Sequence, residues 1–404
     1  MRLMHLADLH LGFRQFQRST PNGLNQREAD VGHAFARAVD ITIERAPEVV
    51  VIAGDLFHTV RPSNPAILQA TSQLLRLKRA LPEAIVVIIG GNHDTPRASE
   101  SGCLLDLFTA LGAHVADVEA DRFDFPDRDL SILAVPEAVS ERPLFAPNPS
   151  ARWNVLLTHL AVTDVCPLAE HGLSASLEEL APERWSYVAL GHYHVYHELA
   201  PNATYVGSIE YTSTNVWGEL EEQARKGVAG KGIVEFDLAT GERTFHPIAP
   251  VRRFVDLPVI DAESMSPAEL DAALAANVAA VDGGIRGLVA RQVVRNVTRT
   301  LTRDLDHRAL RAFKAQALHY QLDTRKSDPV AATRAARAPL PSLEEMLRVR
   351  LEARVIASDI PRDKLIELGM GYLTAAAEVP QREALVEVDA GVETGETVAN
   401  EVAA

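Results

Sequence analysis

The chain has 404 residues, a formal net charge of −15 at pH 7 and only 5% aromatic residues. Its two cysteines, Cys103 and Cys166, form no CxxC pair, which argues against a disulfide framework and for a reducing compartment. No apolar run approaches the roughly 20 residues of a membrane span, and the N-terminus lacks a signal-peptide pattern. We therefore expect a soluble, cytoplasmic protein of two or three domains, with no membrane partner.

Residues 1–250 are predicted to form an α/β domain, because strand-like runs alternate with helical patterns at 28–45, 66–81 and 101–111. Five of the runs are short, apolar and continuous, as expected of strands that are buried on both faces. These runs are residues 3–7, 49–52, 85–89, 155–157 and 187–190. Further strands are expected at 203–209 and 232–238, and we interpret the charged, glycine-containing segment between them, 218–231, as a mobile loop.

Each of the five runs ends in side chains that can bind a metal ion, and the ligand crevice of such a sheet lies at the carboxyl ends of its strands. These side chains are Asp8, His10, Asp55, Asn92, His159, His192 and His194. Alternate residues of an extended chain point the same way, so Asp8 and His10 can hold one ion together. A carboxylate such as Asp55 can bridge two ions. Any one histidine alone is more often structural, but five such strand ends together predict a two-metal site of manganese, iron or zinc.

Residues 251–327 are predicted to form a second, smaller α+β domain. Strands are expected at 255–260 and 288–297, and helices at 266–281 and 307–318. Eight basic residues lie between Arg286 and Lys314, against two acidic ones, which indicates either a solvated face or a phosphate-contacting surface. The acidic balance of the whole chain is only a caution against nucleic acid, since a local basic face or bound cations can reverse the sign.

The remaining residues read as a linker, a helical segment and a tail. Residues 328–341 are rich in proline, alanine and arginine, which is typical of a linker. Residues 342–380 contain two amphipathic helices that cannot bury both apolar faces alone, which favours a partner surface or packing onto the body. Residues 381–404 are rich in acidic residues and in residues with small side chains, and we expect them to be disordered.

The strand-end motifs resemble the five signatures of calcineurin-like metallophosphoesterases. They are Asp-Leu-His at 8–10, Gly-Asp at 54–55, Gly-Asn-His-Asp at 91–94, Thr-His at 158–159 and Gly-His-Tyr-His at 191–194. The resemblance implies an α/β fold with a two-sheet core flanked by helices. Longer matches at 5–12 and at 54–58 with 61–63 are similar to the nuclease subunits of SbcC/SbcD-type complexes for double-strand-break repair. Residues 252–255 resemble the entry to that family's DNA-capping domain.

The resemblance also implies roles for the site residues. One ion would be held by Asp8, His10, Asp55 and His194, and the other by Asp55, Asn92, His159 and His192. His93 would act as general acid or would stabilise the transition state, with Asp94 placed to orient it. His58 marks the nuclease branch and is expected to face the scissile phosphate, although a histidine at a helix start often merely packs.

Three functions remain open at this point. The leading hypothesis is a manganese-dependent DNA nuclease, with double-strand exonuclease and single-strand endonuclease activity, that works with an SbcC-type ABC ATPase. A phosphodiesterase for nucleotides or other small phosphoesters would need the same metals but no second domain, linker or terminal helices. A scaffold that binds DNA ends is disfavoured by the complete ligand set. The resemblance also implies a homodimer, for which five apolar positions are available unless they are ordinary core: Ile67, Leu68, Leu104, Leu105 and Phe108.

Overall fold

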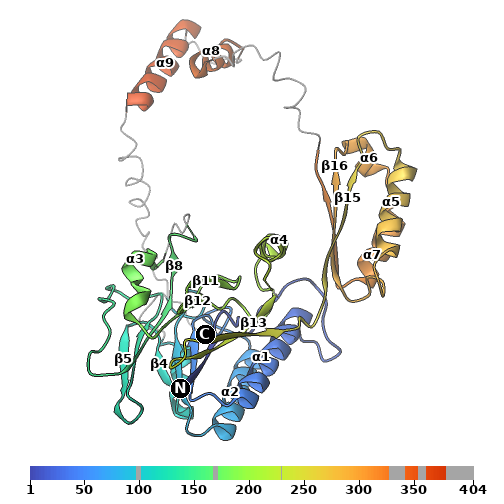
Figure 1. The fold of residues 1–404 in the computed structure, drawn as a ribbon. Helices are drawn as coiled ribbons and strands as arrows, with labels where there is room; N and C mark the ends of the chain where they lie inside the picture. The colour runs from blue at the N-terminus through green and yellow to red at the C-terminus, as the bar shows by residue number, and fades with distance from the viewer. Residues whose placement is uncertain (97–101, 167–171, 229, 327–341, 354–360, 379–404) are drawn as a thin grey trace, which may run out of the picture. The chain divides into compact units, whose positions relative to one another are not determined.

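The computed structural model describes residues 1–96, 102–166, 172–228, 230–326, 342–353 and 361–378. The chain divides into two compact units, Met1–Ser327 and Asp328–Ala404 (Figure 1). The first unit contains two six-stranded sheets and a separate three-stranded sheet. The second unit contains two helices.

The first six-stranded sheet has the order β14-β13-β1-β2-β3-β4, and β1 to β4 run parallel. The strands are β1 (Arg2–Leu6), β2 (Val49–Ala53), β3 (Ile85–Ile89), β4 (His114–Ala116), β13 (Lys231–Asp237) and β14 (Arg243–Ile248). Every residue of β2 is buried, which explains why its sequence is continuously apolar rather than alternating. Val49 and Val51 face the second sheet, whereas Val50 and Ile52 pack under helices.

The second six-stranded sheet has the order β11-β12-β10-β7-β6-β5, with β6, β7, β10 and β12 parallel. Its strands are β5 (Asp121–Phe125), β6 (Leu130–Val135), β7 (Trp153–His159), β10 (Tyr187–Gly191), β11 (His197–Ala200) and β12 (Ala203–Tyr205). One apolar core fills the space between the two sheets, where Leu3 and Val51 meet Val155 and Ala189. The predicted two-sheet α/β sandwich is therefore confirmed.

Two helices cover the outer face of the first sheet, α1 (Gln26–Arg45) and α2 (Asn64–Ala80). The side chain of Asn25 caps α1 by accepting from the backbone of Arg27 and Glu28, and Ser63 caps α2. The predicted helix at 101–111 is a 3-10 helix, η2 (Leu104–Leu111), whose residue 101 lies outside the described residues. Leu105 and Phe108 of η2 are fully buried core residues, whereas Leu68 of α2 is 69% exposed.

The outer face of the second sheet carries shorter elements, β8 (Ala161–Val162), β9 (Ser174–Ala175), α3 (Leu177–Leu180) and the 3-10 turn η4 (Pro182–Arg184). Another 3-10 turn, η3 (Pro126–Arg128), joins β5 to β6. Trp185 and Tyr205 anchor the apolar cluster beneath these elements. Tyr205 fixes the chain there, because its hydroxyl donates to the carbonyl oxygen of Leu160 and accepts from the amide of Val162.

Residues 254–324 form a three-stranded parallel sheet with helices and a core of its own. The elements are β15 (Phe254–Asp261), α5 (Pro267–Ala279), β16 (Val289–Arg295), α6 (Arg299–Arg303), α7 (His307–Gln316) and β17 (His319–Thr324). We refer to this part as the second module. The sequence pattern did not indicate β17, because its alternation is weak and it follows a helical pattern without a turn signal. Within the module, Leu270 and Leu274 of α5 pack on Ala290 and Val294 of β16.

The second module contacts the sandwich through a buried ionic network and an aromatic cluster. Arg27 is fully buried and contacts Asp30 and Glu210 at 3.1 and 3.2 Å, while Arg252 of the junction contacts Asp30 at 2.7 Å. Phe254 lies against the guanidinium of Arg27, with 5.1 Å from Cζ to the ring centroid. Because a buried charge without its partner is costly, this network fixes the position of the junction.

The segment 218–231, interpreted from the sequence as a mobile loop, is instead mainly a helix, α4 (Val216–Lys226), followed at Lys231 by β13. The prediction was wrong because it gave more weight to the charged, glycine-containing composition of the segment than to the helical spacing of its few apolar residues. Asn215 caps its first turn, and Gly227 ends it with a positive φ of 66°. Trp217 packs against Phe254 of the second module.

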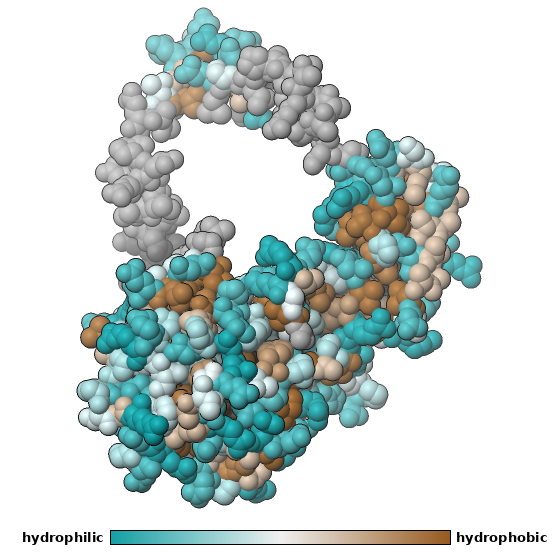
Figure 2. Space-filling model, in the orientation of Figure 1, coloured by the Kyte–Doolittle hydropathy of each residue, from teal (hydrophilic) through white to brown (hydrophobic). Residues whose placement is uncertain are grey.

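The second unit contains α8 (Leu343–Ala353) and α9 (Arg362–Glu378) as described helices. The two helices pack together at a glycine, since a Cβ added at Gly369 would lie 2.7 Å from Cδ1 of Leu351. Figure 2 shows hydrophobic surface among hydrophilic side chains on this helix pair. Val349 is 63% exposed and Tyr372 is 74% exposed. The predicted linker and tail lie outside the described residues. Among the described helices, none is both long and apolar enough to cross a membrane.

The close approach of the two sheets at Gly191 gives a direct test of the sandwich. A Cβ at Gly191 would lie 1.8 Å from the carbonyl oxygen of Ala53, so Gly191→Ala must push the sheets apart. We expect it to lower the free energy of unfolding by about 1 to 3 kcal/mol, as overpacked cores do. Chemical denaturation measures this change. Gly32→Ala in α1 is the control, because its Cβ would meet Gln69 at an ordinary 3.6 Å. Equal stability of the two variants would contradict the packing described.

Candidate metal centre

The carboxyl ends of five strands meet at one edge of the sandwich. In the first sheet, β1, β2 and β3 lie side by side and parallel, so the segments after them run together. The amide of Asp8 donates to the carbonyl oxygen of Gly54 at 3.1 Å, and that of His10 to Asp55 at 2.9 Å. In the second sheet, Gly191 of β10 is in register with His159 of β7. The strand ends predicted from sequence to converge therefore do so.

Glycine makes the junction between the sheets possible. Nδ1 of His159, from the second sheet, lies 2.8 Å from the carbonyl oxygen of Ala53, from the first. A Cβ at Gly54 would lie 2.2 Å from that same nitrogen, and Gly54 has a φ of +85°. A Cβ at Gly91 would lie 2.2 Å from Oδ1 of Asp55. Only glycine fits at these positions without moving a site residue.

Asp8, His10, Asp55 and His194 form one half of the cluster. Nε2 of His10 lies 3.0 Å from Nε2 of His194 and 3.6 Å from Oδ2 of Asp55. Asp8 joins them, since its ligand atom and those of His10 and His194 lie within 4.8 Å of one another. Asp8 also accepts from the amide of His192 at 3.1 Å, which ties the two sheets together.

Asn92, His159 and His192 form the other half, with Asp55 shared between the halves. Oδ1 of Asn92 lies 3.1 Å from Nε2 of His159 and 3.3 Å from Nδ1 of His192. Oδ2 of Asp55 lies 3.7 Å from Nε2 of His159. The same carboxylate oxygen therefore faces His10 on one side and His159 on the other. All seven side chains predicted from sequence lie in one cluster.

Four of the seven residues have a positive φ, a backbone conformation that residues other than glycine seldom adopt. The φ angles are 51° at Asp8, 48° at His10, 53° at Asp55 and 101° at His192. Left-handed backbone at residues other than glycine is uncommon and costs of order 1 kcal/mol or more at each position. Such strain persists only where the surrounding structure imposes it, and it gathers at functional sites.

Burial opposes charge on these groups. Burial raises the pKa of the Asp8 carboxyl to about 6, although His194 nearby lowers it. Burial, followed by the charges of Asp94 and Asp8, raises the pKa of Asp55 well above its usual range. Burial likewise lowers the pKa of His192 to about 4 and that of His159 far below its ordinary value. The imidazoles of His159 and His192 are thus neutral, with lone pairs available for a metal ion.

This chemistry fits divalent cations. Among the described residues, the ion-pair partners of Asp55 are the imidazoles of His10 and His159, which burial keeps uncharged. A cation would supply the missing positive charge and favour the ionised carboxylates. Two carboxylates, one amide oxygen and four imidazoles form a mixed set that suits transition metals rather than calcium. These seven residues can therefore hold divalent metal.

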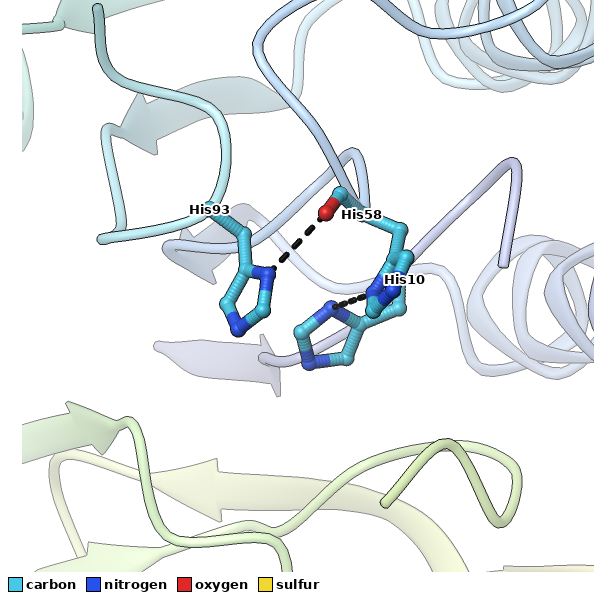
Figure 3. A group of neighbouring side chains, drawn as sticks. All are labelled: His10, His58 and His93. Atoms are coloured by element: carbon cyan, nitrogen blue, oxygen red, sulfur yellow. Dashed lines mark hydrogen bonds between the residues drawn. The ribbon is translucent and has the colours of Figure 1, made fainter. Parts of the chain in front are cut away.

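His58 and His93 stand beside this cluster with His10 (Figure 3). The two rings stack, with centroids 5.0 Å apart and planes at 21°. Nδ1 of His58 lies 3.3 Å from Nδ1 of His10, and Nδ1 of His93 lies 3.0 Å from the carbonyl oxygen of His58. Burial lowers the pKa of His58 to about 4. Both histidines line the same pocket as His192 and His194.

Asp94 lies below the site rather than against the ring of His93. Its carboxylate accepts from the amides of Gly91 at 2.8 Å and Phe57 at 3.2 Å. The resemblance implied that Asp94 orients His93, whereas in the structure Nδ1 of His93 lies against the carbonyl oxygen of His58. The reason is that residue 94 turns inward while residue 93 turns toward the pocket. Asp94 holds the loops after β2 and β3 together.

The pocket over the cluster has a volume of about 400 Å³ and contains residues that the sequence did not indicate. These are Tyr193, Val195, Thr212, Ser213, Thr214, Glu219 and Glu222. Glu219 and Glu222 come from α4, and their carboxylates contact His194 and Tyr193 respectively. They were missed because α4 was read as a loop. The helical spacing of Val216, Leu220 and Gln223 was the available signal.

Comparison with known proteins agrees with this geometry. Residues 1–196 match the family described as calcineurin-like phosphoesterase, a span that contains all seven clustered side chains. These residues form a calcineurin-like phosphoesterase domain, as the strand-end motifs predict.

Several relatives carry the name DNA double-strand break repair protein Mre11. The chain is 29% identical over 260 residues to that of Thermoplasma acidophilum, covering 59% of this chain and 62% of the relative. It is 31% identical over 208 residues to that of Sulfurisphaera tokodaii, covering 48% and 49%. With that of Methanocaldococcus jannaschii, the identity is 25% over 282 residues, covering 66% and 72%. The chain thus spans less than two thirds of the first two relatives.

Removal of the shared carboxylate tests the cluster. We expect Asp55→Ala to bind neither of two Mn²⁺ ions, because the variant lacks the group that faces both halves and would screen the two cations from each other. Isothermal titration calorimetry and metal analysis measure the stoichiometry. Asp127→Ala is the control, because Asp127 is an exposed carboxylate in η3. Two tightly bound equivalents in Asp55→Ala would show that the cluster is not the metal site.

Proposed function

We propose that this chain is a two-metal-dependent DNA nuclease, acting as a double-strand exonuclease and single-strand endonuclease in double-strand-break repair. The observation that carries the proposal is that two further imidazoles, His58 and His93, adjoin the seven-residue cluster at His10. The ligand atoms of these three histidines lie within 4.8 Å of one another. The shared name of the relatives supports DNA as substrate. A phosphodiesterase for small phosphoesters is the alternative.

The proposed metal ligands follow the two halves of the cluster. One ion would be held by Asp8, His10, Asp55 and His194, and the other by Asp55, Asn92, His159 and His192. We propose manganese, which suits a mixed carboxylate, amide and imidazole set. When bound, a pair of such ions supplies a water-derived nucleophile at neutral pH and stabilises charge in a displacement at phosphorus.

His93 is proposed to act on the phosphate rather than on the metal. The carbonyl oxygen of His58 holds its Nδ1, which favours the proton on that nitrogen and leaves Nε2 for the substrate. Burial lowers the pKa of His93, whereas the carbonyl of His58 raises it. An incoming phosphodiester anion would raise it further and favour the imidazolium. His93 can then neutralise charge on the phosphoryl oxygens or protonate the leaving alkoxide.

His58 is proposed to contact the scissile phosphate beside His93. Its ring stacks on His93 and meets Phe13 edge-on, with centroids 4.9 Å apart. These ring contacts fix the imidazole at the pocket wall. In this position His58 would position DNA and support the ring of His93.

The separate roles proposed for Asn92, His93 and His58 can be tested by substitution. We expect His93→Gln to keep both ions and DNA binding but to lose turnover by about 10²- to 10⁴-fold, as on removal of an acid–base group. Asn92→Ala should instead weaken metal binding and recover partly in excess Mn²⁺. His58→Ala should impair DNA cleavage more than hydrolysis of bis-p-nitrophenyl phosphate, whose activated leaving group needs less protonation. The measurements are metal content, DNA affinity and both activities.

Two outcomes would contradict these assignments. Loss of the ions in His93→Gln would make His93 a metal ligand. An equal loss on both substrates in His58→Ala would remove its role at the DNA phosphate.

The second module is proposed to carry DNA beside the site. Seven of its eight basic residues between 286 and 314 are exposed, and these are Arg286, Arg295, Arg299, Arg303, Arg308, Arg311 and Lys314. Arg291 is the exception, because it is buried and pairs with Asp256 and Glu221. Exposed basic side chains can give sequence-independent contacts to phosphates, so the overall acidic charge does not oppose a DNA partner.

The second unit is proposed to bind an SbcC-type ABC ATPase through the apolar face of α8 and α9. Met346, Val349, Leu368 and Tyr372 are all at least 46% exposed, although the two helices pack together at Gly369. An exposed apolar helix face suits a groove on a partner. A homodimer is also proposed, with Leu68 of α2 as the exposed position, since Leu105 and Phe108 belong to the core.

Charge placed on this face tests the ATPase contact. We expect the double variant Val349→Glu/Tyr372→Glu to lose stable co-elution with the ATPase, because a buried carboxylate without a partner is costly. Single-strand nuclease activity should remain, since the metal cluster lies in the other unit. Size-exclusion chromatography of the mixed proteins is the measurement, with Glu352→Gln on α8 as the control. Normal co-elution of the double variant would move the interface elsewhere.

A further inference from the structure

Helix α4 places a buried carboxylate directly behind one of the proposed metal ligands. Glu219 is 8% exposed, and its Oε1 lies 3.2 Å from Nδ1 of His194. The other ring nitrogen of His194, Nε2, faces His10 at 3.0 Å, which is the side of the metal cluster. The imidazole of His194 is therefore placed between a carboxylate and the cluster.

Glu219 is held in turn by a buried lysine. Nζ of Lys231, at the start of β13, lies 2.9 Å from Oε2 of Glu219. The same ammonium donates to the carbonyl oxygen of His194 and to Oγ of Ser208, both at 2.8 Å. Its side chain is 1% exposed. Lys231 thus contacts the backbone carbonyl of His194, and Glu219 contacts its ring.

The ammonium of Lys231 supplies a counter-charge for the buried carboxylate of Glu219 at 2.9 Å. An ionised carboxylate opposite Nδ1 favours the tautomer with the proton on Nδ1. The lone pair of Nε2 then points to the cluster.

The other candidate imidazole ligands are oriented differently. Nδ1 of His159 faces the backbone carbonyl of Ala53, and Nδ1 of His10 faces His58. Among the described imidazoles of the cluster, His194 has a carboxylate at Nδ1 within ion-pair distance. A carboxylate in that place fixes the ring and increases the basicity of the ligating nitrogen more than a carbonyl does.

We infer that Glu219, locked by Lys231, is a positioning residue that fixes the ring and tautomer of His194 toward a divalent metal ion. This inference rests on the metal centre proposed above. Glu219 acts through His194 and does not itself join the groups of side chains whose ligand atoms converge within 4.8 Å. Its consequence is that an α4 residue, outside the strand-end motifs, controls the affinity of one ion.

The test is Mn²⁺ binding by the full chain, measured by isothermal titration calorimetry rather than by activity. We expect Glu219→Ala to weaken one of two Mn²⁺ equivalents by about 10- to 100-fold, as the loss of a ligand-orienting group does, and to leave the other equivalent unchanged. Excess Mn²⁺ should restore full stoichiometry. Glu221→Ala is the matched control, since Glu221 lies on the same helix with its side chain 72% exposed.

A second variant guards against loss of folding, because Glu219→Ala leaves Lys231 buried without its anion. Glu219→Leu/Lys231→Met removes the pair at similar volume and should show the same weakened equivalent. Wild-type affinity at both sites in these variants would overturn the positioning role alone. Loss of one equivalent that excess Mn²⁺ does not fully restore would also overturn it, because a positioning residue changes the affinity of a site and not its presence. If the unmodified chain bound no Mn²⁺, the metal centre itself would be wrong, and the inference with it.

Discussion

The structure depends on the close approach of two sheets at the ends of their central strands. His159 of one sheet contacts the carbonyl oxygen of Ala53 in the other at 2.8 Å, and Gly191 leaves no room for a side chain between them. Strand ends from both sheets therefore supply one cluster, which neither sheet could complete alone. The left-handed backbone at Asp8 and Asp55 is part of this constraint, because it turns each carboxylate into the junction as its strand ends.

Burial at this junction disfavours the charged carboxylates, and a bound cation would compensate for that effect. Without a counter-charge, the pKa of Asp55 lies well above its usual range and the imidazole of His159 stays neutral. A divalent ion reverses the preference of the carboxylate and uses the lone pair of the imidazole. Helix α4 adds a second set of paired charges next to the cluster, because its Glu219 contacts both Lys231 and the ring of His194. Trp217 of that helix also donates to Gln321, so α4 spans from the metal cluster to the second module.

Much of the sandwich and all seven clustered side chains could be predicted from the sequence, because buried parallel strands leave continuous apolar runs and metal ligands follow them directly. Val49 to Asp55 shows both signals within seven positions. What could not be predicted depends on contacts distant in sequence. Helix α4 begins at an asparagine cap, carries Gly218 in its first turn and is fixed by Lys231, so its local pattern resembles a loop. Likewise, the family resemblance implied that Asp94 orients His93, whereas Asp94 contacts the amide of Gly91 and His93 contacts the carbonyl oxygen of His58.

The central claim is that one cluster at the sheet junction holds two divalent ions. Anomalous X-ray diffraction from crystals of the full chain grown with Mn²⁺ tests it most directly. The account predicts two anomalous peaks on either side of the Asp55 carboxylate, one beside His10 and His194 and the other beside Asn92 and His159. A structure with manganese bound elsewhere, or with a single ion that Asp55 does not contact, would contradict it.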